Sequence, residues 1–408
     1  MEDTELPLAK QLESATFKLD TLLNITQAIN NDLSADDLLQ SYKEILVEKF
    51  AVGNFLLFVK NATWHCVLSN NIYGVEEQNI EPLITNFQQY TKIEKVHFLN
   101  KEYTVIPIFH HEQALAYLLI TDQTALKHGS PTKIHLDFIQ TITNIVVGAI
   151  ENRHLYEEQL EKESLKKEIE VASRMQAMLI PNAETLPHNE HISVASFYAP
   201  HSHVSGDYFD FTQLSDTDYG FCIADVSGKG IAAAMLMANF HANVRAFARL
   251  GVQVDLPYIV KELDAYINNF LQGEKFITFF IARYNIERKL LHYVNAGHNP
   301  PLFWSAQEKK IRYCTEGSVG LGMLDHIDNI TQGEIYVHSG DKILCYTDGL
   351  SEAKNDKSQE FGTLEMEHAI AKKATVQDAI DYLNKKLHNF LGTQSPHDDM
   401  SILGIDFK

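Results

Sequence analysis

The chain contains few of the residues that mark secreted, membrane-spanning or disordered proteins. Only four of its 408 residues are cysteine, and no two of them form a CxxC pair, so neither a disulfide framework nor a zinc site is expected. Glycine (20 residues) and proline (11 residues) are too scarce for a low-complexity chain. No apolar run approaches the roughly 18 residues that a membrane span requires. We therefore expect a folded protein without a membrane segment, whose thiols are reduced and buried: Cys66, Cys222, Cys314 and Cys345.

Basic residues are also scarce. The chain has 34 Lys and Arg residues against 54 Asp and Glu residues, a formal net charge of -20. Nucleic acids and anionic membrane surfaces are bound by clustered positive charge, so we expect neither as a partner. The surplus of carboxylates is typical of a soluble protein or of one that binds divalent cations. The acidic N-terminus, MEDTELPLAK, lacks the apolar core of a signal peptide, and the expected location is the cytoplasm.

The length predicts two or three domains, and the first segment, residues 1–33, is predicted to be helical. Its apolar positions are spaced alternately by four and three residues, which is the pattern of an a/d seam. We consider two interpretations: the seam pairs with another helix, as in a dimer, or it packs on the next domain of the same chain. The seam consists of Leu8, Leu12, Ala15, Leu19, Leu22, Thr26 and Ile29.

Residues 34–150 are predicted to form a compact α/β module. Ser34 is a suitable N-cap for a helix over 36–50. Strand-like runs follow at 55–59, 63–68, 103–109 and 115–121, with helices at 80–90 and 132–150. This order of elements resembles a GAF-type sensor domain, which implies an unidentified ligand or protein partner. His110 and His111 are adjacent, so on a strand they point to opposite faces and do not predict a metal site.

Residues 151–181 are highly charged and are predicted to form a coiled-coil-like helical linker. Its helices are expected to pair across a homodimer, and a solvated single helix is the alternative. The helix is expected to end at Ile180–Pro181, because proline disfavours the helical conformation in the residue before it.

Residues 182–408 are predicted to fold as an α+β sandwich. Helices are expected at 231–250, 257–271, 364–372 and 375–391. Strands are expected at 191–198, 208–214, 219–226, 276–284, 289–295, 301–304, 334–337, 342–347 and 400–407.

Four short segments of this region place aspartate at the edge of an apolar strand, beside small residues. They are SGDYFD (205–210), ADVSGKG (224–230), YTDGLSEA (346–353) and HDDMS (397–401). A single Asp-Gly pair is chiefly a turn signal. Several carboxylates that converge are unfavourable unless a cation lies between them, and carboxylates and backbone carbonyls are the ligands of Mg²⁺ and Mn²⁺. The repetition therefore predicts a divalent-ion site.

Further motifs accompany these segments: QAMLIP (176–181), DVSGKGIAAAMLMA (225–238), VNAGHNPPLF (294–303), LGM (321–323) and FG (361–362). With them, residues 176–407 resemble the SpoIIE/RsbU branch of the PPM (type 2C) protein phosphatases. The resemblance implies a PPM-type β-sandwich flanked by helices, with a binuclear Mn²⁺ or Mg²⁺ centre. It also implies a phosphoserine or phosphothreonine protein as substrate, in this family commonly a STAS-type anti-sigma factor antagonist. A catalytically silent scaffold and an enzyme for small phosphorylated molecules are the alternatives.

The resemblance also implies roles for individual residues. Asp207 is expected to bridge the two ions, and Asp225 to bind one of them. Asp399 occupies a position where the wider superfamily carries Asn, so it is the lesser candidate. The implied metal ligands are Asp207, Asp225, the backbone carbonyl of Val226, Asp348, Asp398 and Asp399.

Other residues near these segments have two interpretations each. Lys229 stands where the family usually has His, and it either contacts phosphate or belongs to a solvated turn. His298 is either a general acid or part of a structural turn. Asp210 is three residues beyond Asp207, on the opposite strand face, and is not expected to be a ligand. The helix beginning at Ile231 either controls how Asp225 meets the metal or is an ordinary core helix.

Overall fold

The structure, a computed structural model, describes residues 8–31, 33–60, 63–72, 93–98, 101–110, 113–121, 132–271, 275–394 and 396–408. The chain divides into two compact units, Met1–Glu163 and Ser164–Lys408. This division falls within the predicted linker. The predicted helix at 80–90, and His111, lie outside the described residues.

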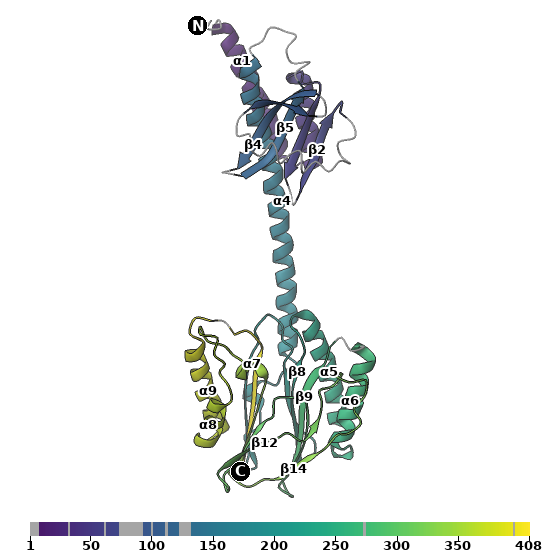
Figure 1. The fold of residues 1–408 in the computed structure, drawn as a ribbon, viewed down its shortest axis with the longest axis vertical. Helices are drawn as coiled ribbons and strands as arrows, with labels where there is room; N and C mark the ends of the chain where they lie inside the picture. Colours follow the sequence, from purple (N-terminus) through teal and green to yellow (C-terminus); the bar gives the residue numbers. More distant parts are fainter. Residues whose placement is uncertain are drawn as a thin grey trace. The chain divides into compact units, whose positions relative to one another are not determined.

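The N-terminal unit combines helices with one antiparallel sheet (Figure 1). Its helices are α1 (Leu8–Asn30) and α2 (Ala35–Glu44), and a π-helical turn (Ile45–Lys49) follows α2. The side chain of Ser34 accepts the N–H of Asp37 at 3.1 Å, which confirms the predicted N-cap. The five strands lie in the order β2-β1-β5-β4-β3. They are β1 (Phe55–Lys60), β2 (Trp64–Asn70), β3 (Glu94–Phe98), β4 (Lys101–His110) and β5 (Gln113–Thr121), of which β3 was not predicted.

Only part of the predicted seam of α1 packs within this unit, where Leu22 and Ile29 lie against the hydrophobic core. Thr21 and Ile25 of α1 are buried, whereas Leu8, Leu12 and Leu19 are 83%, 69% and 65% exposed. The interpretation in which the seam packs on the chain's own next domain is therefore wrong for these three leucines. Three exposed leucines on one helix leave apolar area in contact with water, which is unfavourable at about 25 cal/mol per Å².

The predicted helix at 132–150 and the linker helix form a single element, α4 (Thr132–Ala177), of 46 residues. Its first part is an ordinary core helix, in which Ile142 and Val146 are buried. Leu155, Leu160 and Leu165, further along, are exposed. Residues 149–177 contain no Gly or Pro. No residue therefore breaks the backbone hydrogen bonds where the two predicted helices meet.

The C-terminal unit contains two sheets, and every strand run predicted for it is confirmed. The first sheet has the order β13-β10-β9-β8-β7, with β14 also paired to β10. The second has the order β12-β11-β15-β16-β6. The short strands β12 and β13 were not predicted. The bounds are β6 (Ile192–Ala199), β7 (Tyr208–Gln213), β8 (Asp218–Val226), β9 (Ile277–Asn285), β10 (Leu290–Ala296), β11 (Leu302–Ser305), β12 (Lys310–Tyr313), β13 (Gly317–Ser318), β14 (Gly333–Tyr336), β15 (Lys342–Tyr346) and β16 (Met400–Phe407).

Helices cover both sheets (Figure 1). The helices α5 (Ile231–Arg249) and α6 (Leu256–Leu271) contact the first sheet. The helices α8 (Leu364–Lys372) and α9 (Val376–Leu391) contact the second. All four helices were predicted. Thr375 caps α9 through a reciprocal pair of hydrogen bonds with Asp378.

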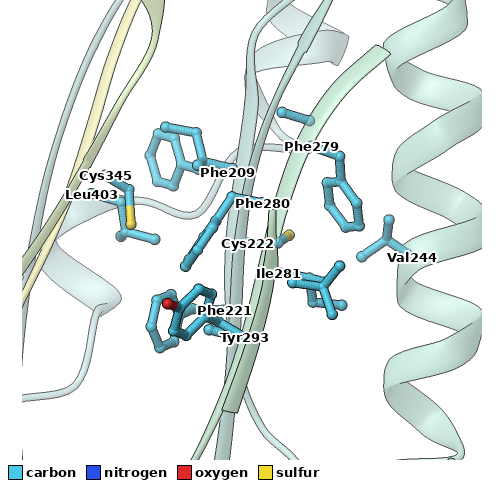
Figure 2. Close-up of a cluster of buried hydrophobic side chains, with 14 of the residues drawn as sticks. Phe209, Phe221, Cys222, Val244, Phe279, Phe280, Ile281, Tyr293, Cys345 and Leu403 are labelled. Atoms are coloured by element: carbon cyan, nitrogen blue, oxygen red, sulfur yellow. The ribbon is translucent and has the colours of Figure 1, made fainter. Parts of the chain in front are cut away.

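Side chains of the first sheet alternate between two buried faces (Figure 2). Phe280 of β9 points towards the second sheet, where Cys345 and Leu403 lie, whereas Phe279 points towards Val244 of α5. Both phenylalanines are completely buried. A strand that is covered on both faces has no polar face, which explains why β9 is almost continuously apolar.

Cys222, Cys314 and Cys345 are free thiols and are buried as expected, whereas Cys66 is only partly buried, contrary to expectation. Burial raises the pKa of the Cys314 thiol to about 12. A thiol that stays protonated is a poor nucleophile. Within the described ranges, no helix combines the length and the apolar character needed to cross a bilayer.

Candidate metal centre

The predicted aspartates are placed at the ends of strands from both sheets. Asp207 immediately precedes β7, and Asp225 is the next-to-last residue of β8. Asp348 follows β15 and opens the short helix α7 (Asp348–Ser351), while Asp398 and Asp399 immediately precede β16. The strands β7 and β8 pair in the first sheet, and β15 and β16 pair in the second. The structure thus brings the four acidic segments to one region between the sheets.

Asp207 is the most deeply buried of these residues, with 1% of its surface exposed. Its Oδ2 atom accepts hydrogen bonds from the Thr347 hydroxyl at 2.8 Å and from the Ser401 hydroxyl at 2.7 Å. The Thr347 hydroxyl in turn accepts the backbone N–H of Ser401 at 2.9 Å. Two hydroxyls of the second sheet therefore orient a carboxylate of the first. Sequence reasoning included Thr347 and Ser401 in the motifs but gave them no role.

The carboxylates raise one another's pKa values. Burial and the charge of Asp225 hold the pKa of Asp207 well above its usual range. Burial, followed by the charges of Asp348 and Asp398, raises the pKa of Asp225 to about 7. The pKa of Asp348 is raised by burial and by Asp398. A bound cation would stabilise these neighbouring negative charges and would lower the pKa values of the carboxylates.

Glycines allow the acidic segments to approach closely. A Cβ atom on Gly349 would lie 2.0 Å from the carbonyl oxygen of Asp399, which no side chain tolerates. A Cβ atom on Gly206 would lie 3.0 Å from the carbonyl oxygen of Val226. Gly349 does not have a positive φ. Its Asp-Gly sequence therefore serves close contact between two backbones, in addition to any turn.

Asp399 uses both of its carboxylate oxygens to hold the loop before β7. Oδ1 accepts the N–H of His201 at 2.7 Å, and Oδ2 accepts the N–H of Gly206 at 2.9 Å. The side chain is buried. These two hydrogen bonds position the loop that carries Asp207. Whether Asp399 also binds metal, as the lesser candidate, stays a prediction.

Residues 215–408 match the model of the family described as Stage II sporulation protein E (SpoIIE). This part of the chain is therefore similar to SpoIIE-type domains. The phosphoserine phosphatase RsbU of Bacillus subtilis (strain 168) is 27% identical over 195 residues, which are 48% of this chain and 56% of RsbU. The phosphoserine phosphatase RsbP of the same organism is 30% identical over 195 residues, which are 46% of each protein. The match spans about half the length of each relative.

The fold of the C-terminal part of the chain also matches a solved structure. The SiaA-PP2C domain of Pseudomonas aeruginosa superposes with a TM-score of 0.52 and 18% identity, over 61% of this chain and 99% of that domain. The α+β, PPM-type fold predicted for the C-terminal part of the chain is therefore confirmed as a PP2C-like fold of sheets and helices.

Gln176, which is buried near the end of α4, ties this helix to the loop before β7. The amide of Gln176 accepts the N–H of Ser205 at 2.9 Å and donates to the carbonyl of Ser205 at 2.7 Å. It also donates to the carbonyl of Ala234 in α5 at 3.5 Å. Gln176 belongs to the QAMLIP motif, yet sequence reasoning gave it no role. One amide thus links α4, α5 and the segment two residues before Asp207.

His298 has the structural role that was one of its two interpretations. Its Nε2–H donates to the carbonyl of Tyr346 at 3.1 Å, which makes Nδ1 the acceptor for the Thr278 hydroxyl at 2.8 Å. The ring is buried, and burial lowers its pKa to about 4. Both ring nitrogens are occupied and the ring is uncharged at neutral pH, so the geometry does not support a general acid.

Asp210 lies on the α5 side of β7, away from the other aspartates, as predicted. Arg245 of α5 binds it twice, with Nε at 2.6 Å from Oδ2 and a terminal nitrogen at 2.9 Å from Oδ1. The Tyr208 hydroxyl donates to the same carboxylate at 2.8 Å. Because the carboxylate is buried, this bidentate pair is a structural contact between α5 and the first sheet.

Lys229 has a contact that neither of its two interpretations anticipated. Its ammonium nitrogen lies 3.0 Å from Oδ2 of Asp398 and donates to the carbonyl of His397. Lys229 belongs to the segment between β8 and α5, whereas Asp398 precedes β16. The ion pair therefore connects segments that come from different sheets.

The donor set suits a hard divalent ion, since it offers carboxylates with raised pKa values and the nearby carbonyl of Val226. In the part of the chain that the structure describes, no three His, Cys, Asp or Glu side chains already surround one point closely enough to hold an ion.

Proposed function

We propose that this chain is a metal-dependent serine/threonine phosphoprotein phosphatase. The proposal rests chiefly on the meeting of aspartates from both sheets in one region, where burial and mutual repulsion raise their pKa values. It is supported by relatives that carry the name phosphoserine phosphatase. The three buried thiols, Cys222, Cys314 and Cys345, are poor nucleophiles because burial raises their pKa values.

The predicted metal ligands would come from both sheets. Two divalent ions, Mn²⁺ or Mg²⁺, would supply an acidified water and orient the phosphoryl oxygens. Asp207 would hold both ions, kept in place by the hydroxyls of Thr347 and Ser401. The remaining ligands would be Asp225, the carbonyl of Val226, Asp348, Asp398 and, as the lesser candidate, Asp399.

The metal dependence is tested on the purified full chain with p-nitrophenyl phosphate. We expect turnover to disappear in EDTA, to return with added Mn²⁺, and to be lost in Asp207→Ala and Asp348→Ala. Asp328→Asn is the matched control, because this aspartate is exposed and is paired with His326. Turnover that survives metal removal would contradict the proposal. Absence of turnover in an intact, Mn²⁺-loaded protein would favour the silent scaffold.

The proposed substrate is a phosphoserine or phosphothreonine protein, and a phosphorylated STAS-type anti-sigma factor antagonist is the first to test. The chain and this substrate are incubated with Mn²⁺, and released phosphate is compared with that from small phosphoesters at equal concentration. We expect a much higher kcat/KM for the phosphoprotein, because remote contacts with a protein substrate lower the barrier. Faster hydrolysis of the small phosphoesters would instead indicate a small-molecule phosphatase.

We further propose that the chain is a cytoplasmic homodimer, paired through α1 and the linker part of α4. The support is the row of exposed leucines on both helices, including Leu12 and Leu19 of α1 and Leu160 of α4. Light scattering should give a dimer mass, and Leu12→Glu with Leu19→Glu should lower it. A monomer at micromolar concentration in the unmutated chain would refute this arrangement.

The N-terminal unit is proposed to be a GAF-like sensor whose ligand or protein partner is unidentified. We also propose that α5 controls how Asp225 meets the metal, because α5 begins six residues after Asp225 and is held to Gln176. The test compares the Mn²⁺ affinity of the full chain with that of residues 164–408. Equal affinity and equal turnover would count against regulation through α5.

A further inference from the structure

We infer that Lys229 is a tethered cation that competes with a divalent ion for Asp398, and that it thereby weakens metal binding at this side of the centre. The inference concerns the regulation of the proposed metal centre and rests on it. It gives Lys229 a role other than contact with phosphate or a place in a solvated turn.

The local backbone presents Lys229 between two glycines of unusual conformation. Gly228 and Gly230 have φ values of 86° and 76°, which other residues rarely adopt. The segment therefore has a specific shape at this point. Gly228 is also in close contact with Lys275, whose ammonium group donates to the carbonyl of Ser227 at 2.8 Å. The loop that carries Lys229 is thus fixed on its other side.

The ammonium group of Lys229 is paired with the Asp398 carboxylate, which is a predicted ligand of the ion. Its nitrogen lies 3.0 Å from Oδ2 of Asp398 and also donates to the carbonyl of His397. Lys229 is therefore paired directly with one of the aspartates that the second sheet contributes as predicted ligands.

A divalent ion bound by Asp398 would meet this ammonium group at close range. Either the Lys229–Asp398 pair breaks, or two cations share one carboxylate and repel each other. The side chains are 52% and 42% exposed, so water screens the pair and its effect is moderate. We expect loss of the Lys229 charge to tighten Mn²⁺ binding by about three- to tenfold.

A purely structural role for Lys229 predicts the opposite sign. If the ion pair only holds the two loops together, its removal loosens the centre and weakens metal binding. The direction of the change in Mn²⁺ affinity therefore separates the two roles.

The experiment measures Mn²⁺ binding to the metal-free full chain by isothermal titration calorimetry at constant ionic strength, so that no catalytic assay is needed. The variants are Lys229→Met, which keeps the length without the charge, and Lys229→Arg, which keeps the charge. Lys386→Met is the matched control, since it breaks an exposed ion pair with Glu365 whose atoms are 3.4 Å apart. We expect tighter binding for Lys229→Met, and near-unchanged binding for Lys229→Arg and for the control.

Unchanged or weaker Mn²⁺ binding by Lys229→Met overturns the inference, provided that circular dichroism shows the variant to be folded. Equal tightening in the Lys386→Met control also overturns it, because the effect would then be one of net charge. Failure of the proposed function gives a different result. In that case the unmutated chain binds no Mn²⁺, or Asp207→Asn binds it as tightly as the unmutated chain does.

Discussion

Replacement of Gln176 by alanine provides a direct test of how the centre is supported. The amide of Gln176 makes two hydrogen bonds to the backbone of Ser205, at 2.9 and 2.7 Å. Ser205 is fully buried and lies two residues before Asp207. Alanine removes both bonds and leaves a buried N–H and a buried carbonyl without these partners. Asp399 still holds the neighbouring N–H of Gly206, so the loop should loosen while the domain stays folded.

The size of the effect follows from the buried polar groups. A buried donor or acceptor that loses its partner costs about 1–3 kcal/mol. Two such groups, partly relieved by water that enters the gap, should lower the free energy of unfolding by about 2–4 kcal/mol. A tenfold change in an equilibrium constant corresponds to about 1.4 kcal/mol. We therefore expect Mn²⁺ affinity to fall by at least about tenfold if only part of this energy acts at Asp207.

The assay combines urea unfolding in EDTA with Mn²⁺ titration of the full chain. Gln176→Glu should lie between alanine and the unmutated protein, because a carboxylate accepts the Ser205 N–H but donates nothing to the carbonyl. Gln159→Ala is the control, since this amide is exposed on the same helix. A Gln176→Ala protein with unchanged unfolding and unchanged Mn²⁺ affinity would refute the reasoning.

Three further predictions concern the fold, the close contact and the pH dependence. Arg245→Met should destabilise the protein by about 3–5 kcal/mol in urea unfolding, because it leaves Asp210 buried without its ion-pair partner. Gly349→Ala should abolish Mn²⁺-dependent turnover, because its Cβ atom would lie 2.0 Å from a backbone oxygen, whereas Gly148→Ala meets nothing within 4 Å and should be neutral. In EDTA, the folded chain keeps a proton on Asp225 up to about pH 7, whereas the unfolded chain loses it near pH 4. The free energy of unfolding should therefore fall as pH rises from about 4 to about 7, and Asp225→Asn should reduce this slope.

Each of these predictions has an outcome that contradicts it. The Arg245 prediction fails if the double variant Asp210→Asn/Arg245→Met has no higher free energy of unfolding than Arg245→Met alone. The unpaired Asp210 carboxylate would then not be the cause of the destabilisation. The Gly349 prediction fails if the alanine variant binds Mn²⁺ and turns over normally. The pH prediction fails if the slope in EDTA is the same with and without the Asp225 carboxyl group.

The long regular elements were predictable because their signals are local. Residues 219–226 and 342–347 read as strands from their apolar and β-branched content, and the structure contains β8 and β15 there. The α4 helix was predicted in two parts, because a change from apolar to charged composition at residue 151 resembles a boundary. Helix continuity depends on the backbone ladder, which a change in side-chain polarity does not interrupt. The short strands β12 and β13 have four and two residues, too few to show a strand pattern in the sequence, and they are defined by their pairing with β11 and β10.

The sequence by itself determined which residue types carry the chemistry, because four aspartate-bearing segments beside small residues already predict a divalent-ion site. Only the tertiary structure decided which neighbours each aspartate has. It placed the hydroxyls of Thr347 and Ser401 on Asp207, and it paired Lys229 with Asp398. The physical reason is that ligand chemistry is a property of single side chains. Orientation, burial and charge pairing depend on contacts between residues far apart in the chain, such as Ser401 and Asp207, which are 194 positions apart.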